Sequence, residues 1–458
     1  MENIRKQLEQ EYKRIKQTGL DGLFIHPDDI YPIINHLIEE YNASGEIDEK
    51  DEYFNISQAG TSFLEKPIYK IILGTGPISI FLWSQMHGNE PTATASLFDL
   101  INYTRSPQNK AWFDSWRDKI TLHIVPMLNP DGAELEQRIN GQGIDINRDA
   151  KALQTPEGRL LLSLADKIKP QFGFNLHSQS RFYTVGKTSQ SAVISLLAPA
   201  YNDAKETNES RKKAKQLVAL INQAIHQQYP NHVGRYDDTY SFRSFGDLLT
   251  AKGISTILIE AGYYKNDKQR QIPRWLTFLS IIESINAIRD QSYITQSLDN
   301  YETIPFNKSD GLVDVLLKNV AMPGDYQVDI SINCDDHFKN GTIEAIGDLS
   351  TLTGLFTKDM GLYQLETLED FTLEEPMTLS TDAYIDLLRN GYGYFVGDPS
   401  LLKIDTDFPV LVNPEHIKIA QINDRTQLNK PANFLFSKEG KMSLAIITGV
   451  VIELDAAL

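Results

Sequence analysis

The chain alternates short apolar runs with longer stretches of helical periodicity. Several of the short runs are apolar at consecutive positions, which is typical of strands buried on both faces of a sheet. The five runs are Ile68–Leu73, Ile78–Trp83, Ile120–Leu128, Phe172–Leu176 and Thr256–Ile259. The helical patterns that separate and follow them cover residues 92–105, 156–168, 207–228 and 271–290. Since such strands need helices over both faces, the pattern predicts an α/β fold.

The sequence changes character beyond about Asp299. Long helical patterns give way there to short strand-like runs and to turn signals such as Glu439-Gly440. A chain of 458 residues also exceeds the usual size of one domain. We therefore predict an α/β domain over residues 1–298, with N-terminal helices in residues 1–45, and a smaller β-rich domain over residues 299–458.

The formal net charge of −17 belongs almost entirely to the C-terminal part. Residues 299–458 carry 11 basic and 26 acidic side chains, a net charge of −15, while residues 1–298 have a net charge of −2. An acidic surface argues against nucleic acids and anionic membranes as partners. Its simplest explanation is a well-solvated surface that aids solubility, and the alternative is a docking surface for a protein partner.

Three further features bear on the cellular setting. The sequence has no run of about 18 apolar residues, which argues against a membrane span. The charged, helix-like N-terminus, Met1–Tyr12, differs from a signal peptide. The single cysteine, Cys334, excludes an intrachain disulfide and a thiolate-rich zinc site. We expect a cytoplasmic protein, unless a leader has been removed from a longer precursor.

Two residues in the turn after the second apolar run, His87 and Glu90, have the character of metal ligands. Their spacing alone is a common pattern, and His36 and Glu39 repeat it within an amphipathic helical stretch. The first pair differs because it follows an apolar strand and precedes Pro91, which opens a helical pattern. A strand end that leads into a helix start is where α/β proteins place their chemistry.

A third ligand is available at His177, where the run that starts at Phe172 leads into a polar turn. A catalytic zinc ion takes three protein ligands through nitrogen or oxygen and leaves one position open for water. We therefore predict one zinc ion per chain, bound by His87, Glu90 and His177.

Glu260 closes the most apolar run of the chain, which begins at Ile254. Burying an unpaired carboxylate is costly, so Glu260 must either face a site or escape to solvent. Beside a zinc ion it would suit the carboxylate that takes a proton from water and passes it to the leaving amine.

The segment 128–149 is rich in Gly, Asn, Asp and Arg, a composition typical of turns. It contains Arg138, Asn147 and Arg148. Because guanidinium groups bind carboxylates through two parallel hydrogen bonds, these residues are candidates to clamp a substrate carboxylate beside the zinc site. Without the neighbouring zinc ligands they would be read as surface residues.

Five motifs stand in the order that they have in the zinc carboxypeptidases of the carboxypeptidase A type, peptidase family M14, which this sequence resembles. They are His87-Xaa-Xaa-Glu90, Asn129-Pro-Asp-Gly132, Asp145-Ile-Asn147-Arg148, His177-Ser178 and Glu260. The resemblance covers about residues 55–290 and leaves the C-terminal part outside. It implies a mixed, mostly parallel sheet flanked by helices.

The resemblance implies a role for each matched position of the metal site. It implies that His87, Glu90 and His177 bind zinc and that Glu260 is the general base and acid. Asp145 matches the carboxylate that orients the first zinc histidine.

Other matched positions concern the substrate. The resemblance implies that Arg138 polarises the scissile carbonyl and stabilises its oxyanion. It implies that Asn147 and Arg148 hold the terminal carboxylate of the substrate. Tyr240 resembles the mobile tyrosine that closes over bound substrate, although Tyr236 lies nearby.

Some features depart from the pancreatic-type pattern of this family. Glu90 and His177 are 87 residues apart, a shorter spacing than in those enzymes, and Arg148 is followed by Asp149 rather than by an aromatic residue. Asp247 falls where the floor of the specificity pocket would be. One acidic residue at that position does not define the preferred substrate.

The first hypothesis is a zinc-dependent carboxypeptidase that removes the C-terminal residue of a peptide. A second hypothesis keeps the site but makes the protein an amidase or deacylase acting on a small acylated amino acid or a cell-wall peptide. A third is a binding module without turnover, against which Glu260 and Arg138 argue. The sequence leaves open the preferred residue, the role of residues 299–458 and the oligomeric state.

Overall fold

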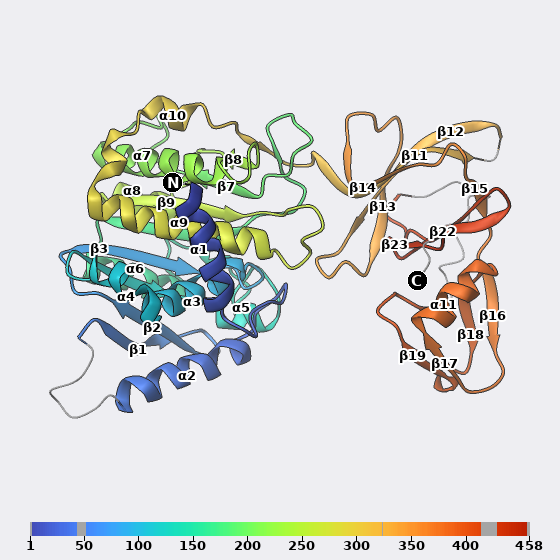
Figure 1. Ribbon diagram of the computed structural model, residues 1–458, viewed down its shortest axis with the longest axis horizontal. Helices are drawn as coiled ribbons and strands as arrows, with labels where there is room; N and C mark the ends of the chain where they lie inside the picture. Colours follow the sequence, from blue (N-terminus) through green and yellow to red (C-terminus); the bar gives the residue numbers. More distant parts are fainter. Residues whose placement is uncertain (1, 44–51, 323, 414–427, 456–458) are drawn as a thin grey trace. The chain divides into compact units, whose positions relative to one another are not determined.

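The computed structural model describes residues 2–43, 52–322, 324–413 and 428–455 (Figure 1). The chain divides into two compact units, Met1–Ser309 and Asp310–Leu458. This division lies eleven residues beyond the predicted boundary at residue 298. The difference arises because the short helix α10 (Leu298–Glu302) packs against α7 (Glu209–His226) of the first unit.

The first unit is built on an eight-stranded mixed sheet with the order β1-β2-β4-β3-β5-β9-β7-β8. Its strands β4, β3, β5 and β9 form a parallel centre, while β1, β2 and β7 each contribute antiparallel pairs. The bounds are β1 Phe54–Thr61, β2 Pro67–Leu73, β3 Ile78–Ser84, β4 Ile120–Val125, β5 Phe172–Ser178, β7 Ile194–Leu197, β8 Val233–Arg235 and β9 Ser255–Ala261. The predicted mixed, mostly parallel sheet is confirmed.

Helices cover both faces of this sheet (Figure 1). The bounds of the helices not yet given are α1 Glu2–Ile15, α2 Pro27–Ala43, α3 Thr92–Arg105, α4 Lys110–Asp114, α5 Pro130–Glu134, α6 Pro156–Ile168, α8 Phe245–Ala251 and α9 Gln271–Asp290. Strand β3 shows why two layers are needed. Its Ile80 and Leu82 pack with α3, α7 and α9, whereas Phe81 and Trp83 pack with α6 and α8. Alternate residues of a strand point to opposite faces, so an apolar run must be covered twice.

Most of the predicted elements of this unit lie where the sequence placed them, and the exceptions are short. The segment between residues 190 and 250 contains two strands, β7 and β8, which were not predicted. Strand β1 was also missed. Strand β4 ends at Val125, three residues before the predicted end at Leu128. A small two-stranded sheet joins β6 (Thr184–Val185) to β10 (Asn307–Lys308).

The N-terminal segment is held on the first unit by a fully buried ion pair. Arg274 of α9 donates from Nη2 and Nε to the two carboxylate oxygens of Asp99 of α3, at 2.6 and 2.8 Å. The hydroxyl of Tyr12 also donates to Asp99, at 2.9 Å. Arg274 Nη1 donates to the backbone oxygen of Leu20, at 2.6 Å. The pair therefore fixes α1 and the segment that follows it.

The second unit is rich in β-structure, as predicted. One four-stranded sheet has the order β13-β12-β11-β14 and another has the order β15-β21-β22-β23, and apolar residues of both share one core. A second core lies beneath α11 (Thr381–Arg389). The strand bounds are β11 Leu312–Met322, β12 Tyr326–Cys334, β13 Gly341–Gly347, β14 Thr353–Asp359, β15 Gln364–Glu366, β16 Glu369–Leu373, β17 Met377–Ser380, β18 Tyr392–Gly397, β19 Leu402–Asp405, β20 Leu411–Val412, β21 Phe434–Lys438, β22 Lys441–Ile447 and β23 Val450–Glu453.

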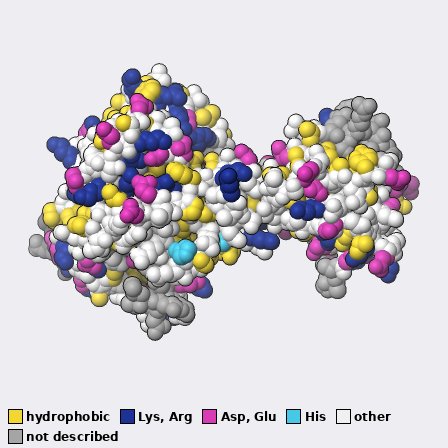
Figure 2. All heavy atoms as spheres, turned by 90° about the horizontal axis from the view of Figure 1, so that it is seen from above, with side chains coloured by type: hydrophobic (Ala, Val, Ile, Leu, Met, Phe, Trp, Pro, Cys, Tyr) yellow, Lys and Arg dark blue, Asp and Glu magenta, His cyan; other side chains and the backbone are white. Residues whose placement is uncertain are grey.

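The surface of the first unit is consistent with its nearly balanced charge. On the face seen in Figure 2, basic and acidic side chains are interspersed over this unit. None of the helices in the described part of the chain has the length and apolar content that crossing a bilayer demands.

Removal of one partner of the buried ion pair should destabilise the first unit strongly. Arg274→Met leaves Asp99 buried without its cation, and such losses typically cost about 3–5 kcal/mol. Urea unfolding should therefore show a clear fall in the midpoint for this variant. Lys110→Met is the control, because Lys110 is 66% exposed and pairs with Asp114 only on the surface, where an ion pair contributes below about 1 kcal/mol. Equal midpoints for the two variants would contradict the role given to the pair.

Candidate metal centre

The parallel centre of the sheet brings three predicted site residues to one edge. His87 follows the end of β3, His177 lies near the end of β5, and Glu260 lies near the end of β9. Strand β5 pairs with β3 on one side and with β9 on the other, and His177 is in register with Glu260. Because the carboxyl ends of parallel strands meet at the same edge, residues 173 positions apart along the chain become neighbours.

The turn that carries His87 and Glu90 is closed by a backbone hydrogen bond from Glu90 N to His87 O, at 3.1 Å. Gly88 sits between them against the backbone of Gly132. A Cβ atom added to Gly88 would lie 1.9 Å from the carbonyl carbon of Gly132. Glycine is therefore required at this close approach, and the contact fixes the turn from one side.

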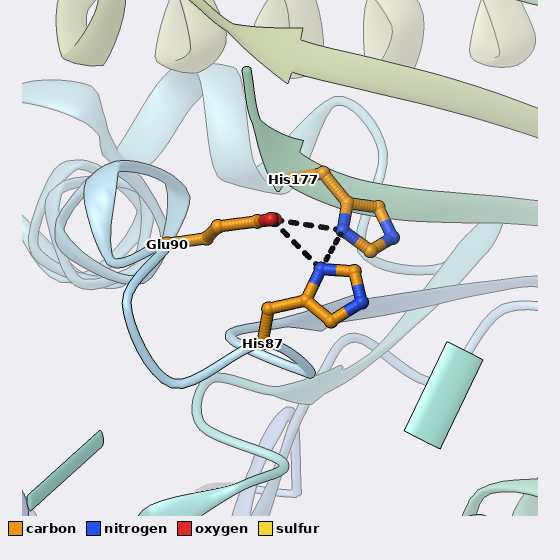
Figure 3. A group of neighbouring side chains, drawn as sticks. All are labelled: His87, Glu90 and His177. Atoms are coloured by element: carbon orange, nitrogen blue, oxygen red, sulfur yellow. Dashed lines mark hydrogen bonds and ion pairs between the residues drawn. The ribbon is translucent and has the colours of Figure 1, made fainter. Parts of the chain in front are cut away.

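Three buried side chains, those of His87, Glu90 and His177, point their ligand atoms toward one another (Figure 3). Nδ1 of His87 lies 2.8 Å from Oε1 of Glu90, and Nδ1 of His177 lies 2.8 Å from Oε2. The two Nδ1 atoms lie 3.1 Å apart. The structure thus brings together the three residues that the sequence named as metal ligands.

This arrangement fits a metal ion. Atoms bound to one ion at about 2.1 Å in tetrahedral directions lie roughly 3.4 Å from each other, close to the separations of 2.8 to 3.1 Å found here. Two imidazole nitrogens and a carboxylate are also the donor set of catalytic zinc sites. Unprotonated nitrogen and carboxylate oxygen atoms this close would repel one another. The cluster of His87, Glu90 and His177 therefore needs a proton or a cation between its ligand atoms.

The pKa values of His87, Glu90 and His177 indicate which of these groups holds a proton when no metal is bound. Burial lowers the pKa of His87, but the charge of Glu90 and the hydrogen bonds with Asp145 and Glu90 outweigh burial and raise the pKa to about 9. Burial lowers the pKa of His177. Burial raises the pKa of Glu90, yet the two histidines outweigh it and hold that pKa well below the usual range. A protonated His87 therefore faces a carboxylate.

Asp145 and Arg138 lie against the same cluster. Nε2 of His87 lies 3.1 Å from Oδ1 of Asp145, so the second nitrogen of the ring is engaged by a carboxylate. Arg138 donates from Nε to Oδ2 of Asp145 at 3.0 Å, and its Nη1 lies 3.3 Å from Oε1 of Glu90. Its side chain is 44% exposed. Asp145 therefore links the candidate metal ligand to a partly exposed cation.

Glu260 is buried beside this cluster with an unusual proton affinity. Burial is the main cause that raises its pKa, and the charge of Glu90 adds to it, while His87, Arg138 and Arg270 act in the opposite direction. The result is a pKa of about 8. A carboxyl group that exchanges a proton near neutral pH is suited to general acid and base chemistry.

Asn147 and Arg148 lie in a short 3-10 helix, η2 (Ile146–Arg148), that is capped by Asp145. The side-chain oxygen of Asn147 accepts a hydrogen bond from Phe245 N, at the start of α8, at 3.0 Å. Arg148 is exposed and donates from Nη1 to the backbone oxygen of Asn147 at 2.7 Å. The structure thus leaves most of the Arg148 guanidinium available at the surface.

Asp247 forms hydrogen bonds with residues that lie just before it in the sequence. Its carboxylate accepts hydrogen bonds from Ser241 N at 3.0 Å and from the hydroxyl of Ser244 at 2.5 Å, in the first turn of α8. Burial raises the pKa of Asp247 and outweighs these bonds and the charge of Arg148, which act to lower it. Both oxygens therefore hold the turn that precedes α8. A role for Asp247 in substrate preference stays a prediction.

Tyr236 lies close enough to the site for the charges of Glu260 and Glu90 to raise its pKa. Its backbone nitrogen donates to Leu196 O at 2.9 Å, which continues the pairing of β8 with β7. Burial raises its pKa, followed by the charge of Glu260 and a hydrogen bond with Tyr183. Tyr240 lies four residues further on, in a half-buried loop position. The role of Tyr240 stays a prediction, and Tyr236 is a second tyrosine that its position after a strand could have indicated.

Known proteins resemble the same part of the chain. Residues 46–254 match the family model of the zinc carboxypeptidases, peptidase M14. A probable carboxypeptidase 2 from Arthroderma benhamiae is 26% identical over 149 residues, which cover 32% of this chain and 26% of that protein. Carboxypeptidase SOL1 from Arabidopsis thaliana is 35% identical over 69 residues, 14% of this chain and 13% of that protein.

Solved structures give more distant similarities. A metallo-carboxypeptidase from Burkholderia cenocepacia aligns with a TM-score of 0.44 and 14% identity, over 58% of this chain and 70% of that chain. The alignment with the Arthroderma protein spans about a quarter of that protein's length. The similarity to the zinc carboxypeptidases, peptidase M14, thus lies in residues 46–254, within the first unit.

Proposed function

We propose that this chain is a zinc-dependent carboxypeptidase that hydrolyses the C-terminal peptide bond of a peptide. The observation that carries the proposal is the convergence of His87, Glu90 and His177 beside a buried Glu260. The match of residues 46–254 to the zinc carboxypeptidase model supports the choice of zinc and of an amide substrate. Glu260 itself lies six residues beyond the segment that matches the family model, so its role rests on its position in the sheet.

One zinc ion per chain would be held by Nδ1 of His87, Nδ1 of His177 and the carboxylate of Glu90. A bound zinc ion supplies Lewis acidity and lowers the pKa of a water molecule. Asp145 would keep the His87 ring oriented through its contact with Nε2. The charge of Glu90 and the two converging imidazole nitrogens favour a cation at this point.

Glu260 would move the proton in the reaction. Its carboxylate would accept a proton from the attacking water and donate it to the nitrogen of the leaving amine. A pKa of about 8 in the metal-free state shows that burial and Glu90 together favour the protonated form. Positive charge next to Glu90 would lower this pKa, so the carboxylate would be available as a base at neutral pH.

Arg138 would stabilise the negative charge that develops on the scissile carbonyl oxygen. It is positioned for this by its hydrogen bond to Asp145 and by its exposure at the edge of the cluster. Asn147 and Arg148 would receive the terminal carboxylate of the substrate, because Arg148 is exposed and can offer two parallel donors. These contacts would select a free C-terminus.

Zinc affinity should depend on pH through His87. Nδ1 of His87 can bind zinc only after the ring has lost its proton, whose pKa is about 9 in the metal-free protein. The apparent affinity should therefore rise at least about tenfold per pH unit as the pH increases from about 7 to 8.5. Zinc binding should release close to one proton from His87 and, below about pH 8, part of a second proton from Glu260, whose pKa would also fall. Chelator competition at several pH values measures the affinity, and calorimetry in two buffers of different ionisation enthalpy measures the protons. A pH-independent affinity would be incompatible with this charge assignment.

Replacement of Glu260 should separate metal binding from turnover. Glu260→Gln retains the size of the side chain but cannot take a proton, so kcat should fall by about 10²–10⁴-fold while the zinc content is unchanged. Elemental analysis and peptide hydrolysis assays provide the two readouts. Turnover at the rate of the unmodified protein would refute Glu260 as the proton carrier.

Replacement of Arg148 should affect only substrates with a free carboxyl end. Arg148→Ala should lower kcat/KM for such peptides by about 10–100-fold, the usual loss for one charge-assisted bidentate contact. C-terminally amidated peptides should be poor substrates for both proteins. Arg159→Ala is a matched control, because Arg159 is also exposed and donates to the backbone oxygens of Leu153 and Gln154. Equal hydrolysis of amidated and free peptides would favour the amidase or deacylase hypothesis instead.

A further inference from the structure

Gln85 occupies a demanding position directly before the metal-ligand turn. It follows Ser84, the last residue of β3, and precedes His87 by two positions. Its side chain is fully buried, and its backbone has a φ of 48°. A residue other than glycine adopts such a left-handed conformation only where its surroundings hold it there. The surroundings of Gln85 therefore need an explanation.

The side-chain amide of Gln85 joins three separate parts of the first unit. Its Nε2 donates to the backbone oxygen of Ile25 and to that of Gly88, both at 2.9 Å. Its Oε1 lies 2.8 Å from the hydroxyl of Thr94 on α3. The two carbonyl acceptors assign the NH₂ group to one side, so the orientation of the amide is defined by its partners.

Through these bonds Gln85 holds the metal-ligand turn at the carbonyl group of Gly88. Gly88 lies between His87 and Glu90, and its carbonyl oxygen is one of the two acceptors of the Gln85 amide. Both acceptors belong to buried residues, Ile25 and Gly88, so loss of the donor would leave two buried carbonyl groups to be satisfied otherwise. The turn can therefore not shift without breaking the Gln85 bonds or colliding with Gly132.

The other acceptor, the backbone oxygen of Ile25, connects the turn with the N-terminal segment. Ile25 follows Leu20, whose backbone oxygen accepts a hydrogen bond from the buried Arg274. Next to Ile25, Nε2 of His26 lies 3.0 Å from Oε1 of Glu136, in the segment that carries Arg138. The N-terminal segment thus contacts the chain two residues before His87 and two residues before Arg138.

We infer that Gln85 is a positioning residue, which holds His87 and Glu90 in their ligand geometry by fixing the turn to the N-terminal segment. The inference rests on the proposed function, because it concerns the zinc affinity of that site. It makes the N-terminal segment a structural part of the metal centre. Outer contacts that orient metal ligands typically contribute 10–100-fold to metal affinity.

The test compares zinc affinity in variants of the full chain. Gln85→Leu keeps the approximate size of the side chain and removes the amide. Gln85→Gly removes the amide and also suits a φ of 48°, so it retains the backbone conformation if Gln85→Leu fails to fold. Both variants should bind zinc about 10–100-fold more weakly in chelator competition. Cobalt substitution should also show an altered absorption spectrum, because the ligand geometry is released.

Gln216→Leu is the matched control. Gln216 is buried in α7 and its Nε2 donates to two backbone oxygens, of Ile294 at 2.9 Å and of Gln296 at 3.2 Å. The Gln216→Leu variant should have a lower melting temperature but an unchanged zinc affinity. This comparison separates a general loss of stability from an effect on the metal site.

Three results would overturn the inference in different ways. If Gln85→Gly bound zinc with unchanged affinity and an unchanged cobalt spectrum, Gln85 would have no positioning role, while the proposed function would stand. If the unmodified protein bound no zinc, the proposed function would fail, and the role of Gln85 with it. A decrease of equal size in Gln216→Leu would also contradict the inference, because the effect would then not be specific to the turn.

Discussion

The candidate site depends on the parallel pairing of β3, β5 and β9. Each strand has a polar site residue at or just beyond its carboxyl end, and these residues become neighbours only when the sheet aligns the three ends. The register of β5 with β9 places His177 opposite Glu260. A shift of one residue would turn one of these side chains to the other face of the sheet. The apolar residues that fill both faces of β3 therefore also determine where the chemistry is located.

Burial then sets the charges of the site. His87, Glu90 and His177 are almost inaccessible to solvent, so their proton affinities are decided by one another and by Asp145 rather than by water. Glu90 is held as a carboxylate, and its charge helps to keep the proton on Glu260 in the metal-free state. A cation among the three ligands would reverse this balance, so the same contacts support both metal binding and proton transfer.

The sequence predicted the parts of the site that depend on strand ends. His87, His177 and Glu260 each lie at or just after the end of an apolar run, and this local pattern was enough to name them. It could not predict Gln85, because its role lies in hydrogen bonds to Ile25 and Gly88 that exist only after the chain has folded. The short strands β7 and β8 were missed because each has very few residues. The domain boundary shifted because α10 finds its packing partner, α7, in the first unit.

The account stands on the presence of a zinc ion at one defined place in the first unit. A crystal structure of the purified, zinc-supplemented protein, with anomalous scattering recorded on both sides of the zinc absorption edge, tests this directly. The account predicts one strong anomalous peak per chain, in contact with Nδ1 of His87, Nδ1 of His177 and the carboxylate of Glu90, and with Glu260 facing the same space. A peak bound by other residues, or no peak at this cluster, would contradict it.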